Sequence, residues 1–465
     1  MTTSTLTANR VGSLDWDSLR SAVDGRLVTP ADADWQQART PWVVNVDQQP
    51  AAVLEVANVA DVVTAVRWAI ESDISVTAQP SGHAPRTTLD DTLLLRTRAL
   101  RGIAVDVEER SAVVGAGVKW GELMRELDNT GLIALCGSNP DPSVVGLLLG
   151  GGVSWFTRAH GFTANSVLSV DLVTPQGELV HVTQESDPEL FWALRGGGGN
   201  FGIVTSFTFR GHDVANIFGG PVLYDIGDTG EVLRWYRDLL PTLPRELSGW
   251  FGVLTIPPAA PFPEELWGRK ACGVVWCYTG DLSKSGEVFK PLTEFGSPLL
   301  VGVQEMPFPI LQSAFDALYP KGLQWYWRAD FFREITDEAI AAHEKFGADL
   351  PTGHSTMHLY PIDGRVNDVG QSDTAFAYRD VTWGGVIVGV DPDPNNAKVL
   401  KDWVIDYWEA LHPTSAGGAY VNMMMDEGQE RIRAAYGPNY ERLAAIKRAY
   451  DPDNVFHVNQ NIQPR

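Results

Sequence analysis

The sequence predicts an α+β protein with two domains, one built mainly from hairpins and one from an antiparallel sheet with helices on one face. Its 465 residues exceed the ~250–300 residues at which a single hydrophobic core stops growing. In the first part, short apolar runs are joined by polar turns. From about Asn216, longer strand-like runs alternate with helical and proline-rich stretches. This change of pattern predicts a domain boundary.

The first part begins with a strand, a helix and a second strand. The apolar residues 51–56 and 74–78 have strand character, and Asn58 is placed to cap the helix between them. The runs at 102–117 and 167–182 each alternate around a polar turn, which is typical of a hairpin. We therefore expect a packed unit of hairpins and helices, without a regular βαβ array.

The central part supplies four apolar runs of strand character, "GWFGVLTI", "ACGVVWCY", "STMHLYPI" and "WGGVIVGV". Residues 283–296 and 337–350 have a helical pattern, so we expect helices covering one face of an antiparallel sheet. The charged amphipathic stretch 427–450 predicts a final helical region, which Pro452 ends.

Composition excludes several classes of partner. The net charge of −22, from 36 Lys and Arg against 58 Asp and Glu, argues against nucleic acid and against an anionic membrane surface. No apolar run approaches ~18 residues, and the N-terminus lacks the pattern of a signal peptide, so we expect a cytoplasmic protein with no membrane span. Cys136, Cys272 and Cys277 lack CxxC spacing, which predicts neither a disulfide framework nor a zinc site.

Glycine is concentrated in three loops, at Gly82, at 150–152 and at 196–199. A formal GxGxxG ends at Gly202, but it follows an apparent helix and opens a strand, the reverse of a dinucleotide-binding Rossmann motif. Each cluster alone is compatible with a tight turn. Together the three clusters indicate a site where backbone amides bind a long anionic ligand, because glycine has no Cβ to block its approach.

The remaining motifs support no other chemistry. His83, in "QPSGHAPRT", is compatible with a surface loop when taken alone. His354 and His358 have the i, i+4 spacing of a metal pair, but their segment reads as a strand and no HExxH is present. No GxSxG motif occurs, so serine hydrolysis is not expected and neither is a metal centre.

Four ordered segments together resemble a known family: "QPSGHAP", "GLLLGGGVSWFTRAHGFTANSV", "DPELFWALRGGGGNFGIVTSFTF" and "AYVNMMMDE…NYERLAAIKRAYDPDNVF". They look like the berberine-bridge-enzyme-like FAD-linked oxidases of the vanillyl-alcohol-oxidase superfamily, in the bacterial branch that includes 6-hydroxy-D-nicotine oxidase. The resemblance runs from about Asp32 to the C-terminus. It implies a PCMH-type FAD-binding domain at 1–212, a substrate-binding domain at 213–414 whose sheet covers the flavin ring, and a segment at 415–465 that completes the FAD domain.

The same resemblance implies a set of cofactor contacts. The loop 80–85 would surround the pyrophosphate, and His83 would bond covalently to the flavin 8α-methyl group, as a positioned imidazole nucleophile can. The expected FAD-binding residues are Gln79, Pro80, Ser81, Gly82, His83, Ala84, Pro85, Gly137, Ser138, Val144, Gly146, Gly150, Gly151, Gly152, Asn165, Gly202, Val204, Asn422, Asn459 and Gln460.

The chain departs from its relatives at two places that matter for chemistry. The cysteine that anchors FAD a second time in many relatives aligns with Asn139, and Cys136 lies three residues too early. We therefore predict attachment through His83 only, with Cys136 a buried apolar thiol. The tyrosine of the family's terminal "NY" is Met423 here, and no carboxylate follows Asp380 in the strand-like run after it. The usual proton acceptor is therefore missing or relocated.

The resemblance predicts an FAD-dependent oxidoreductase that removes a hydride from a small organic substrate, with O2 as the electron acceptor and H2O2 as a product. The Trp and Tyr of the central segment favour an aromatic or polycyclic secondary metabolite over a small sugar. The candidate proton acceptors are Tyr420, Tyr326, His358 and Asp330, although each could be a packed core or rim residue. Alternatives are a flavin-dependent cyclase or isomerase without net oxidation, a carbohydrate or alcohol oxidase, and a flavin-holding protein without turnover.

Overall fold

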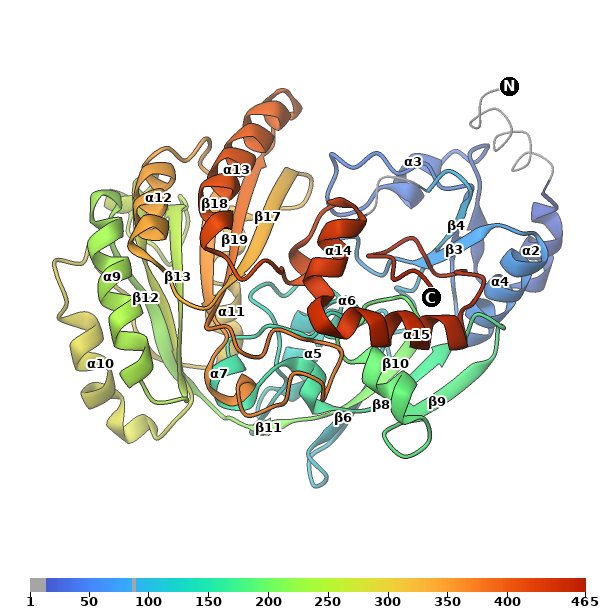
Figure 1. Cartoon of the computed structure of the whole chain (residues 1–465), viewed down its shortest axis with the longest axis horizontal. Coiled ribbons are helices and arrows are strands. Elements are labelled where there is room, and N and C mark those ends of the chain that lie inside the picture. Colours follow the sequence, from blue (N-terminus) through green and yellow to red (C-terminus); the bar gives the residue numbers. More distant parts are fainter. Residues whose placement is uncertain (1–13, 86–88) are drawn as a thin grey trace.

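The computed structural model describes residues 14–85 and 89–465, and its elements separate into two halves (Figure 1). One half holds a four-stranded sheet and a five-stranded sheet, and the other holds a single eight-stranded sheet. None of the helices in the described part of the chain combines the length and apolarity needed to cross a membrane.

The first sheet has the order β1-β2-β4-β3. Its strands are β1 (Arg26–Val28), β2 (Ala52–Glu55), β4 (Thr92–Arg96) and β3 (Ser75–Ala78). Helix α4 (Val59–Glu71) crosses from β2 to β3, and Asn58 caps it by accepting the Asp61 backbone N–H at 3.1 Å, as the sequence predicts. Strand β4 runs parallel to both β2 and β3. The predicted strand, helix and second strand are therefore confirmed as β2, α4 and β3, whereas the general expectation of a hairpin-built unit fails for this layer, in which β2, β4 and β3 are parallel and β1 joins β2 in antiparallel pairing.

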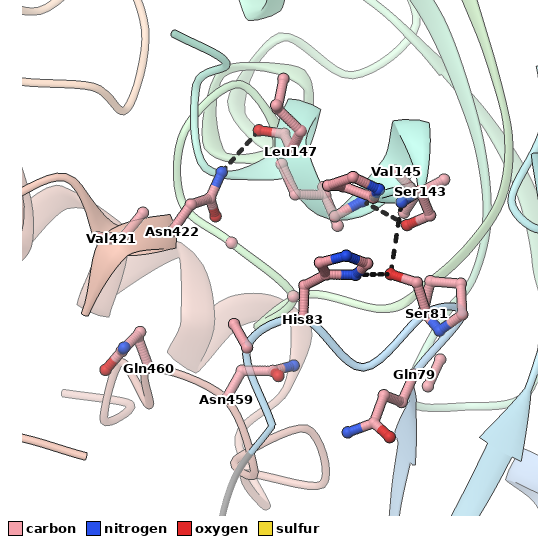
Figure 2. A pocket seen from close by; sticks show the side chains of 18 of the residues that line it. Gln79, Ser81, His83, Ser143, Val145, Leu147, Val421, Asn422, Asn459 and Gln460 are labelled. Carbon is pink, nitrogen blue, oxygen red and sulfur yellow. Dashed lines mark hydrogen bonds between the residues drawn. The ribbon is translucent and has the colours of Figure 1, made fainter. Parts of the chain in front are cut away.

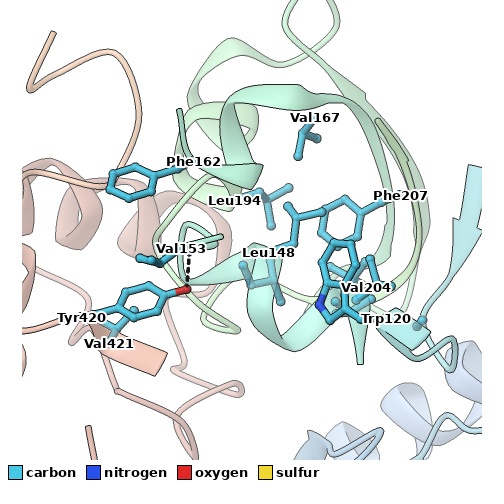
Figure 3. Packing of buried hydrophobic residues seen from close by; sticks show 14 of the residues in the cluster. Trp120, Leu148, Val153, Phe162, Val167, Leu194, Val204, Phe207, Tyr420 and Val421 are labelled. Atoms are coloured by element: carbon cyan, nitrogen blue, oxygen red, sulfur yellow. Dashed lines mark hydrogen bonds between the residues drawn. The ribbon is translucent and has the colours of Figure 1, made fainter. Parts of the chain in front are cut away.

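The second sheet is antiparallel and does consist of the predicted hairpins. Its order is β5-β6-β10-β8-β9, with β5 (Ile103–Asp106), β6 (Ser111–Gly115), β10 (Ile203–Arg210), β8 (Val167–Val173) and β9 (Leu179–Thr183). The segments that connect its strands contain three helices, α5 (Trp120–Leu127), α6 (Val144–Leu149) and α8 (Pro188–Leu194). Figure 3 shows Trp120, Leu148 and Phe207 packed together beneath this sheet, where each is at most 1% exposed. This packing fixes α6, which borders the site described below.

The eight-stranded sheet is antiparallel throughout, with the main order β15-β12-β14-β13-β18-β19-β17 and β16 paired to β12. The strands are β12 (Ile217–Asp225), β13 (Leu247–Thr255), β14 (Lys270–Tyr278), β15 (Leu300–Val301), β16 (Gln304–Met306), β17 (Gln324–Phe332), β18 (Thr356–Pro361) and β19 (Trp383–Asp391). Helices α9 (Thr229–Leu239), α10 (Ser285–Thr293), α12 (Asp337–Ala348) and α13 (Ala397–Leu411) cover its outer face (Figure 1). The other face turns toward the first half.

The C-terminal segment returns to the first half of the molecule (Figure 1). Helices α14 (Gly428–Tyr436) and α15 (Tyr440–Tyr450) belong to it, and α15 packs on α8. The ammonium of Lys447 is fully buried, pairs with Asp451, and donates hydrogen bonds to the Asn200 and Phe456 carbonyls at 2.6 and 2.9 Å. Because Asn200 lies in the glycine-rich loop before β10, this cluster ties the end of the chain to that loop.

Candidate FAD-binding and active site

A cavity of about 370 Å³ lies where these distant segments meet. Its wall comes from the loop after β3, from α6 and the loop before it, from the start of β10, and from the segments 420–424 and 456–460 (Figure 2). Trp250 of β13 and Tyr360 of β18 extend the wall into the eight-stranded sheet. The cavity is therefore shared by the two halves.

His83 occupies a tightly constrained position in the loop after β3. Its ring stacks on Trp42 with centroids 4.3 Å apart. Its Nδ1 is hydrogen-bonded to the Ser81 hydroxyl at 3.0 Å, and that hydroxyl accepts the Ser143 backbone N–H at 3.4 Å (Figure 2). The Nε2 atom is buried and has no partner among the described residues. Burial lowers the pKa of His83 to about 3, so the imidazole is neutral.

Glycine is required beside His83 for steric reasons. Gly82 has φ +80°, and a Cβ there would lie 2.9 Å from the Trp42 backbone nitrogen and 3.0 Å from the Pro41 Cα. The loop can follow its path, and Trp42 can cover the imidazole, only because this Cβ is missing.

The second glycine cluster makes room for the C-terminal segment. A Cβ on Gly150 would lie 2.2 Å from the Asn422 side-chain oxygen. Asn422 donates to the Leu147 carbonyl at 2.8 Å (Figure 2), and the neighbouring Tyr420 hydroxyl accepts the Gly152 N–H at 2.9 Å. These contacts hold the returning chain against α6 and so close the cavity on that side.

Comparison with known proteins explains this arrangement. Residues 50–183 match the family model of an FAD binding domain, and residues 419–463 match the berberine and berberine-like family. The chain belongs to the berberine-bridge-enzyme-like FAD-linked oxidoreductases. The two matched ranges are the segments that the structure brings together around the cavity.

Individual relatives span nearly the whole chain. An FAD-linked oxidoreductase of Dictyostelium discoideum is 28% identical over 95% of each chain. The (R)-6-hydroxynicotine oxidase of Paenarthrobacter nicotinovorans is 26% identical over 95% of this chain and 97% of its own. Among solved structures, Physcomitrella patens BBE-like 1 has a TM-score of 0.86 at 21% identity and covers 97% of this chain and 100% of its own. The glucooligosaccharide oxidase of Acremonium strictum has a TM-score of 0.83 at 21% identity, covering 97% and 99%.

The cavity of this berberine-bridge-enzyme-like oxidoreductase suits FAD. Within the described residues, its wall contains no Asp, Glu, Lys or Arg, so a diphosphate meets amides and hydroxyls without a repelling carboxylate. Buried polar atoms are normally paired, yet Thr97 Oγ1, Trp250 Nε1 and Gln460 Oε1 line the cavity without a partner in the part of the chain described, as does His83 Nε2. These atoms are free to form hydrogen bonds with the polar groups of a bound cofactor.

Most of the residues expected to bind FAD lie in this wall. Those present are Gln79, Pro80, Ser81, Gly82, His83, Ala84, Gly137, Ser138, Gly146, Gly202, Val204, Asn422, Asn459 and Gln460. Those outside it are Pro85, Val144, Gly150, Gly151, Gly152 and Asn165. A Cβ on Gly150, Gly151 or Gly152 would lie within 2.8 Å of Asn422, Phe376 or Thr163, respectively, so close packing requires glycine at all three positions. The side chain of Asn165 is engaged by Arg379 at 3.1 Å.

Two of the candidate proton acceptors lie away from the cavity. Tyr326 stands on the helix-covered face of β17, where its ring lies between Arg328 and Lys401, 5.2 and 5.8 Å from its centroid. Asp330, on the same face, is paired with Arg431 at 2.9 Å and with His412 at 2.8 Å. Their contacts make them parts of the outer layer and of an ion-pair network, not groups that reach a substrate beside the cofactor.

The third candidate, Tyr420, lines the cavity, but its hydroxyl is already engaged. It accepts hydrogen bonds from the Gly152 and Val153 N–H groups at 2.9 and 3.3 Å and from the Asn422 amide at 2.8 Å (Figure 3 shows the Val153 contact). Burial raises its pKa to about 12. Three donors on one neutral hydroxyl leave no lone pair free for a substrate proton, so Tyr420 serves as a clasp between segments.

The fourth candidate, His358, stands beside a residue that the sequence analysis missed. His358 Nδ1 is 2.9 Å from the Tyr360 hydroxyl, and Tyr360 lines the cavity. Trp250, also missed, packs on Tyr360 with centroids 4.5 Å apart. The signal was available in "STMHLYPI", because alternate residues of a strand share a face and Tyr360 is two positions after His358.

Proposed function

We propose that this FAD-linked oxidoreductase is an oxidase of a small aromatic substrate, with O2 as the electron acceptor and H2O2 as a product. The observation that carries the substrate class is the aromatic end of the cavity, where Trp250 and Tyr360 enter the wall. Trp155 stacks on Trp250 with centroids 3.8 Å apart and rings 9° from parallel, and Tyr360 meets Trp250 at 77°, so both rings of this wall are held in place. Rigid aromatic side chains that pack against a ligand ring face-on or edge-on favour aromatic ligands.

The proposed reaction divides between cofactor and protein. Bound FAD supplies the oxidising power by accepting a hydride from the substrate. The protein's residues bind and orient the substrate against the aromatic wall and receive the proton that leaves with the hydride. The names of relatives support the oxidase assignment, since they include a 6-hydroxynicotine oxidase and a glucooligosaccharide oxidase.

We further propose that FAD is attached through His83 alone. The neutral imidazole, held by Ser81 and Trp42, is a nucleophile that can bond to the flavin 8α carbon. The glucooligosaccharide oxidase structure carries 6-S-cysteinyl, 8α-N1-histidyl FAD. In this chain Asn139 lines the cavity at the position aligned with the second anchor of such relatives.

The environment of Cys136 does not allow it to form the second covalent bond to FAD. It is fully buried, its Sγ accepts a hydrogen bond from the Gln312 amide at 3.3 Å, and it does not line the cavity. Burial raises the pKa of the thiol, which keeps it protonated and unreactive.

The test uses the purified protein and a panel of aromatic alcohols, aromatic amines and oligosaccharides. An oxidase of the proposed class loses its yellow colour with an aromatic member of the panel under anaerobic conditions and releases peroxide when air is admitted. Bleaching by oligosaccharides alone would refute the substrate class, and turnover without oxygen uptake would identify a cyclase or isomerase.

The attachment is tested separately by acid precipitation. We expect FAD to stay with the wild-type protein and with Cys136→Ala, and to be released from His83→Ala. Acid-stable flavin in His83→Ala would refute the tether, and release from wild-type protein would do the same.

A further inference from the structure

Strand β18 presents two polar side chains in series at the aromatic end of the cavity. His358 and Tyr360 are two residues apart, so they point to the same face of the strand, the one turned toward the cavity. Tyr360 is 4% exposed and forms part of the cavity wall, while His358 stands behind it. A substrate in the cavity can therefore touch the tyrosine but reaches the histidine only through it.

The hydrogen bond between His358 and Tyr360 joins two neutral side chains. Burial lowers the pKa of His358 to about 4 and raises the pKa of Tyr360, with a further contribution from Tyr319. Both groups are therefore neutral near pH 7. We assign the proton of the neutral His358 to Nε2; in that tautomer Tyr360 donates to Nδ1 across 2.9 Å and keeps its oxygen lone pairs on the cavity side.

Other titratable groups in the described part of the wall are committed elsewhere. The wall contains no carboxylate, lysine or arginine, and His83 is the proposed tether. Tyr420 accepts three hydrogen bonds. Tyr436 donates its hydroxyl proton to the Gly197 carbonyl at 3.1 Å. Tyr360 remains: its hydroxyl oxygen faces the cavity and is hydrogen-bonded to the imidazole of His358.

We propose that Tyr360 and His358 form a relay that takes the proton of a substrate O–H or N–H group as the adjacent carbon loses its hydride. The inference rests on the proposed function and narrows the substrate to an aromatic alcohol or amine. The substrate C–H and O–H (or N–H) bonds break and a C=O (or C=N) bond forms. The hydride with its two electrons goes to FAD. The proton passes to Tyr360 Oη while Tyr360 gives its own proton to His358 Nδ1.

The first experiment tests the relay without turnover. In holoenzyme labelled with ¹⁵N-histidine, the His358 signals are identified as those lost in His358→Gln. We expect an uncharged ring from pH 5 to 9 whose Nδ1 carries no proton, and we expect the Nδ1 signal to move in Tyr360→Phe. A protonated Nδ1, or titration near the ordinary histidine pKa of ~6.5, would overturn the relay.

The second experiment measures the rate of anaerobic flavin bleaching, with benzyl alcohol and benzylamine as probes. Removing a general base typically costs ~10²–10⁴-fold, so Tyr360→Phe should slow bleaching by at least ~10²-fold with little change in the half-saturating probe concentration. His358→Gln should slow it as well. The matched control is Tyr407→Phe, which removes the hydroxyl of a second buried tyrosine–histidine pair, 2.6 Å from His343 Nδ1 and outside the cavity wall, and should change the rate less than ~3-fold.

The outcomes separate the two proposals. An unchanged bleaching rate in Tyr360→Phe refutes the relay while the proposed function stands. If neither probe and no aromatic member of the panel bleaches the flavin of any of the proteins, the proposed function fails. In that case the protonation state of His358 Nδ1 still tests whether Tyr360 donates a hydrogen bond to it.

Discussion

The buried Lys447–Asp451 pair offers a quantitative test of how the C-terminal segment is held. Both side chains are completely buried, and Lys447 also donates to two backbone carbonyls. Burial lowers the pKa of Lys447, yet the adjacent carboxylate favours its charged form. Lys447→Met keeps most of the volume but leaves a buried carboxylate without its cation, which typically costs ~3–5 kcal/mol.

The chain contains a matched control. Lys398 and Asp402 are also four residues apart on a helix, but their side chains are 83% and 54% exposed. Exposed pairs of this spacing contribute only ~0.3–0.5 kcal/mol, so Lys398→Met should hardly change the free energy of unfolding. At ~2–4 °C per kcal/mol for a domain of this size, Lys447→Met should lower the melting temperature by about 10 °C and Lys398→Met by less than about 2 °C.

The assay is a thermal scan of both variants at one heating rate, followed by tryptophan and flavin fluorescence. Flavin should be released from Lys447→Met at the temperature where tryptophan reports unfolding, because Lys447 holds the backbone of Phe456, which lines the cavity. Equal melting temperatures for the two variants would refute the assignment of the buried pair as a tie. Flavin retained well above the tryptophan transition would refute its link to the cavity.

Three further predictions follow from the site and its surroundings. Tyr420→Phe removes the acceptor of two buried backbone N–H groups, so it should lower the free energy of unfolding by ~2 kcal/mol and weaken FAD binding. It should slow anaerobic bleaching less than ~10-fold. A loss of bleaching with an unchanged melting temperature would contradict the role of Tyr420 as a contact that holds the segments together. Asn139→Cys places a thiol in the cavity wall, and in a His83→Ala background it should restore acid-stable flavin, detected by the mass of the flavin-carrying peptide. Partial desolvation of its carboxyl group, and then the nearby Asp141, raise the pKa of Asp316 to about 6, so its contribution to stability falls as pH rises from ~4 to ~6. Asp316→Asn should melt higher than wild type above pH 6 and no higher below pH 4, and equal melting temperatures at pH 7 would contradict the sign.

The sequence predicted the parts of the site that local chemistry determines. The loop around Gly82 and His83 combines turn residues with an imidazole, and the structure places both in the cavity wall. The second glycine cluster lies beside the cavity, and its predicted contact with FAD stays a prediction. A sequence shows that a Cβ is missing at Gly150, and only the fold shows that Asn422 occupies the space.

Strand orientation limited the prediction of reactive groups. Residues 325 and 327 of "WYW" face the first half, so Tyr326 between them faces the helices, and Asp330 follows the same parity. A strand reverses its two faces with a shift of one residue, and nothing local marks which face is inward when both carry aromatic residues. The parallel pairing of β4 escaped prediction for a related reason, because it depends on the crossover through α4 and not on the strand's own residues.

The wall formed by residues 420–424 and 456–460 makes the site depend on two segments that are far apart in the sequence. Residues 14–400 contain the histidine loop and both sheets of the first half, but only part of the site. Tyr420, Asn422 and Lys447, which hold the glycine loop and the C-terminal segment together, all follow residue 400. Without residues 415–465 the cavity would be open on the side that 420–424 and 456–460 close.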